Sequence, residues 1–335
     1  MKAIVQDRYG GLNSLRFGEV DTPRVAPDSV LVRVRAASVH PDVWHVVYGR
    51  PYVLRLMGSG LRRPKNRVPG TDLAGTVELV GRDVTEFQPG DEVFGETLTT
   101  HQWANGGAYA EYASVLAVAL TIKPGNVTFE QAAAVPTAGM IALRSVRDEG
   151  QVRKGQKVLV NGAGGGVGSL VVQIAVAFGA QVTAVDSTAK LDLLRALGAQ
   201  DVIDYTREDY TLQSTRYDLI VDIPGNHPLS EIRRALTRKG TYVLIGHDDF
   251  GRRRGRWIGS IGSFIALLVA GLFVSQRVNP RAVSTTDDPL GVLKGLLEAG
   301  AITPVIDRLF PLAEAADAIR YLEQGTARGR IVVTM

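Results

Sequence analysis

The chain has 335 residues, of which 45% are hydrophobic and 21% are charged, and its formal net charge is +4. This composition predicts about two packed domains, argues against disorder, and gives no electrostatic support for binding nucleic acid. The sequence contains no cysteine, which excludes disulfides, cysteine–zinc sites and thiol catalysis. The first residues lack an apolar signal core, so we expect a cytoplasmic protein.

The first 125 residues predict mostly β-structure. Strands are expected at residues 30–35 and 74–80, and the Pro-Gly pairs at 69–70 and 89–90 indicate turns between strands. The pattern changes at Thr128, which begins an alanine-rich helical stretch.

From Lys157 onward, strands and helices alternate. The predicted strands are residues 158–160, 181–185, 202–204, 219–221 and 241–245, and the predicted helices include 190–197 and 229–236. Two more helices are expected after Pro280, and then a final strand at 329–333. This alternation predicts an α/β fold with a doubly wound parallel sheet, whose ligands bind at the carboxyl ends of the strands.

A glycine-rich turn joins the first of these strands to a helix that ends at Gly179. Its spacing is Ala163-x-Gly165-x-x-Gly168, and the turn comprises Ala163, Gly164, Gly165, Gly166, Val167 and Gly168. The middle glycine lets the backbone approach a pyrophosphate, and the last lets helix and strand pack closely. The turn therefore predicts a dinucleotide site, with a plain glycine-rich turn as the alternative.

Asp186 ends the second strand of this unit, 18 residues after Gly168. An acid at this distance usually binds ribose hydroxyls and repels a 2′-phosphate, which favours NADH. Ser187 and Thr188 follow directly, and their hydroxyl groups are candidate donors to a phosphate.

Residues 258–274 form an apolar run of 17 residues, preceded by Arg252, Arg253, Arg254 and Arg256. A membrane-spanning helix needs about 20 residues. We therefore expect a helix that is buried or lies in a subunit interface. The alternative is contact of residues 252–274 with a membrane surface.

Taken together, these motifs resemble the medium-chain dehydrogenase/reductase superfamily, and most closely its zinc-independent quinone oxidoreductase and enoyl reductase branch. The matching stretches are residues 1–4, 69–75, 87–93, 107–112, 164–168 and 197–199. The resemblance implies a GroES-like β domain (residues 1–125 and 278–335), a Rossmann domain (residues 126–277), an active site between them, and a homodimer.

The resemblance also bears on metal binding. It places His40 and Thr71 at two zinc-ligand positions of the zinc-dependent members, and no cysteine exists for the third. A threonine is a poor zinc ligand, so we expect no metal. Without a Lewis acid, acceptors that are already electrophilic remain accessible, such as quinones and α,β-unsaturated carbonyls.

In the resembling reductases, an asparagine and an aromatic hydroxyl line the substrate pocket, and here His40 and His45 take those positions. We hypothesise that His45 donates a hydrogen bond or proton to the developing enolate, that His40 orients the substrate, and that Asp42 tunes either imidazole. The alternative is a surface helix with solvated or capping histidines. The remaining pocket candidates are Trp44, which we expect to pack, Tyr48 and Tyr52.

Other cofactor contacts are implied by the resemblance. Lys190 matches a phosphate-binding lysine, and Tyr205 matches an adenosine-ribose tyrosine. Thr137 matches a position beside the nicotinamide. Gly246 and His247 match backbone contacts to the carboxamide, and Arg330 lies where the last strand approaches the cofactor. We expect NADPH, with NADH as the alternative.

The sequence thus predicts an NAD(P)H-dependent reductase of small-molecule quinones or α,β-unsaturated carbonyls. Two alternatives stay open. One is a specialised biosynthetic reductase of an enone or imine, and the other is a membrane-associated cofactor-binding protein with little turnover.

Overall fold

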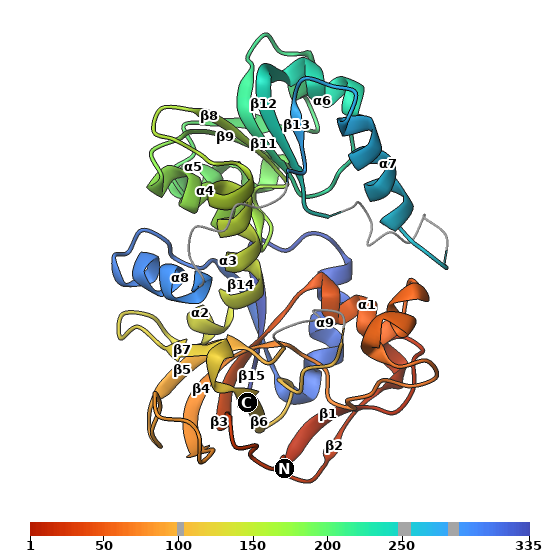
Figure 1. Cartoon of the computed structure of the whole chain (residues 1–335), viewed down its shortest axis with the longest axis vertical. Coiled ribbons are helices and arrows are strands. Elements are labelled where there is room, and N and C mark those ends of the chain that lie inside the picture. The colour runs from red at the N-terminus through yellow and green to blue at the C-terminus, as the bar shows by residue number, and fades with distance from the viewer. Residues whose placement is uncertain (99–103, 247–255, 281–287) are drawn as a thin grey trace.

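The computed structural model of the chain describes residues 1–98, 104–246, 256–280 and 288–335. These residues form two lobes, each built on a large β-sheet, with helices α2, α3 and α8 at the junction between them (Figure 1). We call them the mixed-sheet lobe and the parallel-sheet lobe.

The mixed-sheet lobe contains both ends of the chain (Figure 1). Its sheet has the order β14-β15-β3-β4-β5-β7, with β6 paired to β3, and a separate hairpin pairs β1 with β2. The strands are β1 (Lys2–Gln6), β2 (Leu15–Glu19), β3 (Ser29–Val39), β4 (Asp72–Val80), β5 (Glu92–Glu96), β6 (Tyr112–Leu116), β7 (Leu120–Ile122), β14 (Ile306–Pro311) and β15 (Arg330–Thr334). Because β15 pairs antiparallel with β3, the C-terminal strand completes the N-terminal sheet.

The parallel-sheet lobe has the strand order β10-β9-β8-β11-β12-β13, and every pairing in it is parallel. The strands are β8 (Lys157–Asn161), β9 (Gln181–Asp186), β10 (Asp201–Asp204), β11 (Tyr217–Asp222), β12 (Leu236–Leu244) and β13 (Arg277–Val278). Helices α4 (Gly168–Ala177), α5 (Leu191–Ala196), α6 (Leu229–Ala235) and α7 (Ile261–Gly271) connect or flank them. The central strands are nearly continuous runs of buried apolar residues, as expected for a sheet covered on both faces. The predicted doubly wound parallel sheet is confirmed.

The remaining helices are α1 (Pro41–Tyr48), α2 (Phe129–Ala133), α3 (Pro136–Leu143), α8 (Pro289–Glu298) and α9 (Ala315–Glu323). Helix α2 begins where Thr128 and Gln131 form a reciprocal capping box, which confirms the helix start predicted there. One buried cluster joins α2 and α3 to Ala74 and Phe94 in one lobe and to Val158 and Val160 in the other. The two sheets therefore share a continuous core. The division of domains at 125/126 and 277/278 stays a prediction, and its second boundary falls inside β13.

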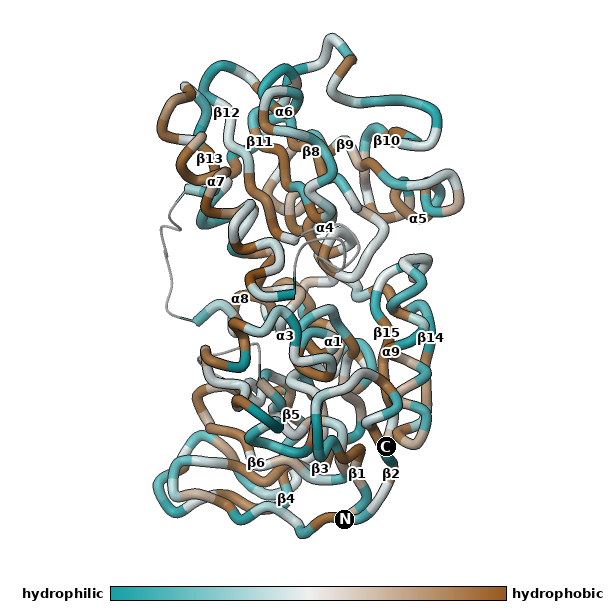
Figure 2. Tube along the Cα trace, turned by 90° about the vertical axis from the view of Figure 1, so that its right-hand side faces the viewer, coloured by the Kyte–Doolittle hydropathy of each residue, from teal (hydrophilic) through white to brown (hydrophobic). Residues whose placement is uncertain are grey.

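The apolar run at 258–274 contains α7, which has no buried residue. Leu268, Leu272 and Phe273 are 47%, 80% and 83% exposed. Figure 2 shows this hydrophobic stretch at the edge of the parallel-sheet lobe. Of the two possibilities predicted for this segment, the described residues do not bury α7, and a subunit interface stays a prediction. No helix in the described ranges has the length and apolar character needed to cross a membrane.

We expect Gly168→Ala to lower the free energy of unfolding by about 1–3 kcal/mol. A Cβ at Gly168 would lie 2.2 Å from the carbonyl oxygen of Gly162 and 2.7 Å from Cα of Ala163, and neither backbone atom can yield. Urea denaturation measures the change. Gly295→Ala in α8 is the control: its Cβ meets nothing within 4 Å, so helix propensity should raise stability by about 0.5–1 kcal/mol. Equal effects of the two substitutions would contradict the packing role of Gly168.

Candidate active site

The glycine turn leads from β8 into α4 with an open backbone surface. Gly162 has a φ of +78°, a conformation that glycine adopts without strain. A Cβ at Gly165 would find no atom nearer than 3.6 Å, whereas one at Gly168 would collide with the strand. The turn is thus open at its middle glycine beside a tight helix–strand contact, which fits a dinucleotide pyrophosphate.

The glycine turn also touches the last strand of the mixed-sheet lobe. The N–H of Gly329 donates to the carbonyl of Gly164 at 2.9 Å, and a Cβ at Gly166 would lie 2.6 Å from Cδ of Arg330. Nε of Arg330 is buried and has no hydrogen-bond partner in the described chain. An orphaned guanidinium N–H beside an open glycine turn is a second feature that fits an anionic group bound there.

Asp186 faces the turn from the end of β9. Its carboxylate accepts hydrogen bonds from the N–H groups of Gly164 and Ser187, both at 2.8 Å. Nζ of Lys190 lies 3.6 Å from Oδ1 of the same acid. The predicted acid and the predicted phosphate-binding lysine therefore lie together, and the lysine offsets the charge with which the acid would repel a 2′-phosphate.

The other predicted cofactor residues differ in their surroundings. The hydroxyl of Thr188 donates to Asp204, so it is already engaged in the absence of a ligand. Tyr205 is 56% exposed. Gly246 follows β12 and packs so closely that a Cβ there would lie 2.8 Å from the carbonyl oxygen of Ile223. His247 lies outside the described residues.

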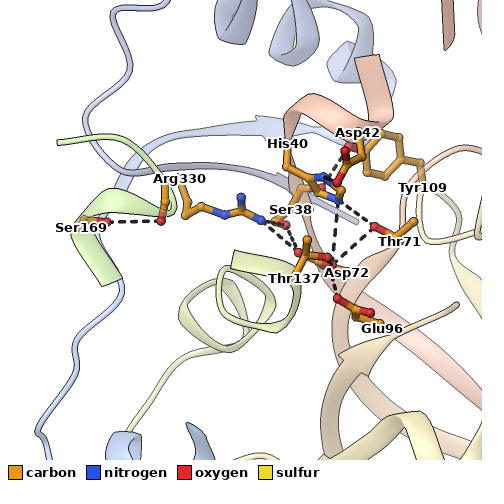
Figure 3. Close-up of polar contacts among 11 residues, drawn as sticks. Ser38, His40, Asp42, Thr71, Asp72, Glu96, Tyr109, Thr137, Ser169 and Arg330 are labelled. Carbon is orange, nitrogen blue, oxygen red and sulfur yellow. Dashed lines mark hydrogen bonds and ion pairs between the residues drawn. The ribbon is translucent and has the colours of Figure 1, made fainter. Parts of the chain in front are cut away.

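A buried polar network lies under the junction of the lobes (Figure 3). Its members come from five segments: Ser38 and His40 around the end of β3, Thr71 and Asp72 at the start of β4, Glu96 at the end of β5, Thr137 in α3, and Arg330 in β15. Sequence reasoning identified His40, Thr71, Thr137 and Arg330 as individual positions. It missed Ser38 and the two acids.

An ion pair forms the centre of the network. Nη2 of Arg330 lies 3.0 Å from Oδ2 of Asp72, and both side chains are buried. Oγ of Ser38 lies 2.7 Å from the same carboxylate oxygen and 2.5 Å from Nη2 of Arg330. These hydrogen bonds satisfy the charges that burial would otherwise make costly.

Thr137 links this ion pair to Glu96. Its Oγ1 lies 2.5 Å from Oδ1 of Asp72 and 2.7 Å from Oε1 of Glu96. Burial and the neighbouring charge of Asp72 raise the pKa of Glu96 to about 7. The sequence signal for Glu96 was an acid at the end of β5, after the buried residues Val93 and Phe94. Nothing in the sequence pattern linked this acid to Thr137.

His40 joins the other side of the network. Its Nε2 lies 2.7 Å from Oγ1 of Thr71, and its Nδ1 lies 3.4 Å from Oδ2 of Asp42. Asp42 therefore lies near His40 without a hydrogen bond to its Nδ1, and its tuning role stays a prediction. His40 and Thr71, which the resemblance places at zinc-ligand positions, are thus hydrogen-bonded to each other. The described ranges hold no group of three or more His, Cys, Asp or Glu side chains that could bind a metal.

His45 makes a hydrogen bond within its own segment, and its role as donor stays a prediction. Nδ1 lies 2.9 Å from the carbonyl oxygen of Arg50. Since a carbonyl only accepts, Nδ1 carries a proton, and any donation to a substrate would have to come from Nε2. Burial lowers the pKa of His45, which disfavours the doubly protonated form.

The aromatic pocket candidates pack against neighbours. Trp44 is 4% exposed, stacks on Tyr48 at 4.5 Å between ring centroids, and donates its indole N–H to Glu323. Tyr52 meets Trp257 edge to face. Trp44 thus packs against its neighbours, as expected for its side chain, and its place in the substrate pocket stays a prediction.

The open glycine turn on a parallel sheet, facing a second lobe with a buried polar network, defines a two-domain dinucleotide-dependent oxidoreductase. Family models agree with this class. One described as an alcohol dehydrogenase GroES-like domain matches residues 26–125, and one described as a zinc-binding dehydrogenase matches residues 197–333.

Individual proteins resemble the whole chain. It is 32% identical to a 2-methylene-furan-3-one reductase of Solanum lycopersicum and 34% identical to a chloroplastic NADPH-dependent alkenal/one oxidoreductase of Arabidopsis thaliana, with 99% of this chain and 79% of each relative covered. A quinone oxidoreductase from Coxiella burnetii has a similar structure, with a TM-score of 0.83, 28% identity, and coverage of 100% of this chain and 99% of that one. The chain belongs to the medium-chain dehydrogenase/reductase superfamily, in its quinone oxidoreductase branch.

We expect Asp72→Asn to lower the free energy of unfolding by about 3–5 kcal/mol, because it leaves the buried guanidinium of Arg330 without its counter-charge. Urea denaturation followed by circular dichroism measures this. Asp7→Asn is the matched control, since the Asp7–Arg67 pair is 50% and 54% exposed and contributes less than about 1 kcal/mol. A loss for Asp72→Asn no larger than for the control would contradict the central role of the pair.

Proposed function

We propose that this protein reduces quinones or α,β-unsaturated carbonyl compounds with NADPH and uses no zinc. The hydrogen bond between His40 and Thr71 carries the metal-free part of the proposal, because it joins the two side chains that would have to face a metal. The names of the similar reductases, an alkenal/one oxidoreductase and a 2-methylene-furan-3-one reductase, support the class of acceptor.

The residues suit such acceptors chemically. When bound, NADPH supplies the hydride. Quinones and enones accept hydride at carbon and spread the resulting charge onto oxygen, so the protein needs hydrogen-bond donors and a proton source rather than a Lewis acid. His40 is the candidate to orient the acceptor, with the Asp42 carboxylate 3.4 Å from its Nδ1. Thr137 is the candidate to lie beside the nicotinamide.

The cofactor preference follows from the charges around Asp186. The glycine turn from Ala163 to Gly168 would hold the pyrophosphate. Lys190 and the Ser187 hydroxyl would hold the 2′-phosphate, because two backbone N–H groups already stabilise the Asp186 carboxylate and Lys190 balances its charge. Arg330 would complete the anion site from β15.

Two further parts of the proposal concern the whole molecule. We propose a cytoplasmic homodimer in which a second copy covers the exposed apolar surface of α7 and the residues after it, because surfaces of this kind usually mark an interface. Contact of residues 252–274 with a membrane is the alternative outcome.

The reductase proposal predicts that the purified protein oxidises NADPH with quinones and with enones, and not with saturated ketones or alcohols, before and after treatment with a metal chelator. Lys190→Ala should raise the Kd for NADPH by about tenfold and leave that for NADH within about twofold, since it removes a charged phosphate partner. Absorbance of the reduced cofactor and fluorescence titration measure these quantities.

Lys294→Ala in α8 is the control, because its exposed pair with Glu298 is unconnected to the glycine turn. Loss of turnover on chelation would contradict the metal-free mechanism. A native preference for NADH that survives Lys190→Ala would contradict the cofactor assignment.

The dimer proposal predicts that Leu272→Asp combined with Phe273→Asp converts the protein from dimer to monomer, measured by light scattering after size-exclusion chromatography. The added charges would be buried without partners in an apolar interface. Val118→Asp places the same charge on an 83% exposed side chain in the mixed-sheet lobe and should leave the dimer intact. A monomeric native protein that sediments with anionic liposomes would support the membrane alternative instead.

A further inference from the structure

Two buried acids lie directly opposite each other on neighbouring strands. The register of β4 and β5 pairs Asp72 with Glu96, whose exposed fractions are 0% and 9%. Like charges at paired positions destabilise a sheet, and buried carboxylates are costly unless compensated. In Figure 3 both side chains approach Thr137. The site therefore requires some means of avoiding two adjacent negative charges.

The Thr137 hydroxyl cannot donate a hydrogen bond to both acids if both are ionised. Its oxygen lies within hydrogen-bond distance of one oxygen from each carboxyl group, at 2.5 Å and 2.7 Å. A hydroxyl has a single proton to donate, and its lone pairs can only accept. One of the two contacts must therefore be a donation from an acid to the hydroxyl, and that acid carries a proton.

The other contacts decide which acid this is. Asp72 receives the guanidinium of Arg330 and the hydroxyl of Ser38 on its second oxygen, at 3.0 Å and 2.7 Å, so a negative charge on Asp72 is compensated. In the parts of the chain that the structure describes, no cation forms an ion pair with Glu96. The charge therefore belongs on Asp72 and the proton on Glu96.

We propose that Glu96 is a neutral acid that donates a hydrogen bond to the Thr137 hydroxyl, which in turn donates to Asp72. Glu96 thereby acts as a positioning residue: it fixes the direction of the Thr137 O–H and keeps the net charge of the network low. The protonation of Glu96 is argued from the contacts alone and does not rest on the proposed function. Its effect on the cofactor does rest on the proposed function, because that proposal places Thr137 beside the nicotinamide.

The surroundings of Glu96 favour the neutral form. The charged or titratable groups that act on it are Asp72 from β4, His40 before α1, Asp42 within α1, and Arg330 from β15. Burial and Asp72 raise its pKa to about 7, against the smaller effects of Thr137 and His40. Because the folded-state pKa lies above the ordinary value of 4.5, Glu96 contributes stability that is complete below pH 4.5 and is lost as the pH rises through about 7.

Ionisation of Glu96 would change the site in two ways. The Thr137 proton would be contested by two carboxylates, and the network would gain one negative charge next to a cofactor that is itself anionic. Binding of NADPH should therefore weaken as the pH rises through about 7.

Infrared spectroscopy of the protein without cofactor tests the protonation state. We expect the carbonyl stretch of a protonated buried carboxyl group below pH 7, its loss above pH 7, and its absence from Glu96→Gln. Subtracting the Glu96→Gln spectrum separates this band from those of other buried acids such as Asp222. Glu92→Gln, on the same strand but with a side chain that is 49% exposed and paired with Lys123, should leave the band unchanged.

The proposal would be overturned if the carbonyl band persisted in Glu96→Gln, or if the native protein showed no such band below pH 7. Should Glu96→Gln fail to fold, Thr137→Val supplies the second test. It removes the hydroxyl that accepts the acid's hydrogen bond and should shift the band in frequency, whereas Thr137→Ser keeps the hydroxyl and should not.

The Kd for NADPH across the same pH range tests the positioning role. The native protein should bind about tenfold more weakly above pH 7 than below it, whereas Glu96→Gln should keep the tighter value because its amide N–H still donates to Thr137. Titration of the cofactor's own phosphate is common to both proteins and cancels. Identical pH profiles would overturn the role. Absence of any NADPH binding would refute the proposed function and leave the infrared result standing.

Discussion

The buried ion pair between Asp72 and Arg330 joins the parts of the molecule on which the site depends. The two residues are 258 positions apart, and the pair connects β4 to the C-terminal strand β15 across the intervening strand β3. Arg330 also packs on Gly166, and the neighbouring Gly329 is bonded to the glycine turn. Strand β15 thereby contacts both the glycine turn of the parallel-sheet lobe and the polar network of the mixed-sheet lobe. A buried charge pair of this kind adds little to the net free energy of unfolding. Removing one partner strongly destabilises the fold, because the other charge is then buried without compensation.

The polar network also supports the proposal that the site works without a metal. Zinc needs several unprotonated donors that converge on one point. Here His40 and Thr71 are bonded to each other, and Thr71 is followed by an acid that is already paired with Arg330. These side chains are hydrogen-bonded to one another, which fits the proposed reduction of acceptors that are electrophilic before they bind.

Two sequence hypotheses show how the role of a side chain depends on what surrounds it. His45 has the right residue type for a proton donor, and in the structure its Nδ1 is hydrogen-bonded to a backbone carbonyl. The segment at 258–274 has the composition of a buried helix, but α7 lies at the edge of the parallel-sheet lobe and no residue of the helix is buried by the described part of the chain. Local composition reports what a segment can bury, and only the complete fold shows whether the same chain buries it.

The sequence by itself determined the parallel sheet, the glycine turn and the family, because these depend on local spacing: apolar runs of strand length, helical periodicity, and glycines where a Cβ would collide. It also pointed to Asp186, which ends a strand at a fixed distance from the turn, and the family resemblance pointed to Lys190. The tertiary structure alone decided that Glu96 meets Asp72 and Thr137, and that Arg330 completes their network. Those residues come from different strands and a helix far apart in the chain, so their pairing depends on sheet register and lobe packing, which leave no periodic signal in the sequence.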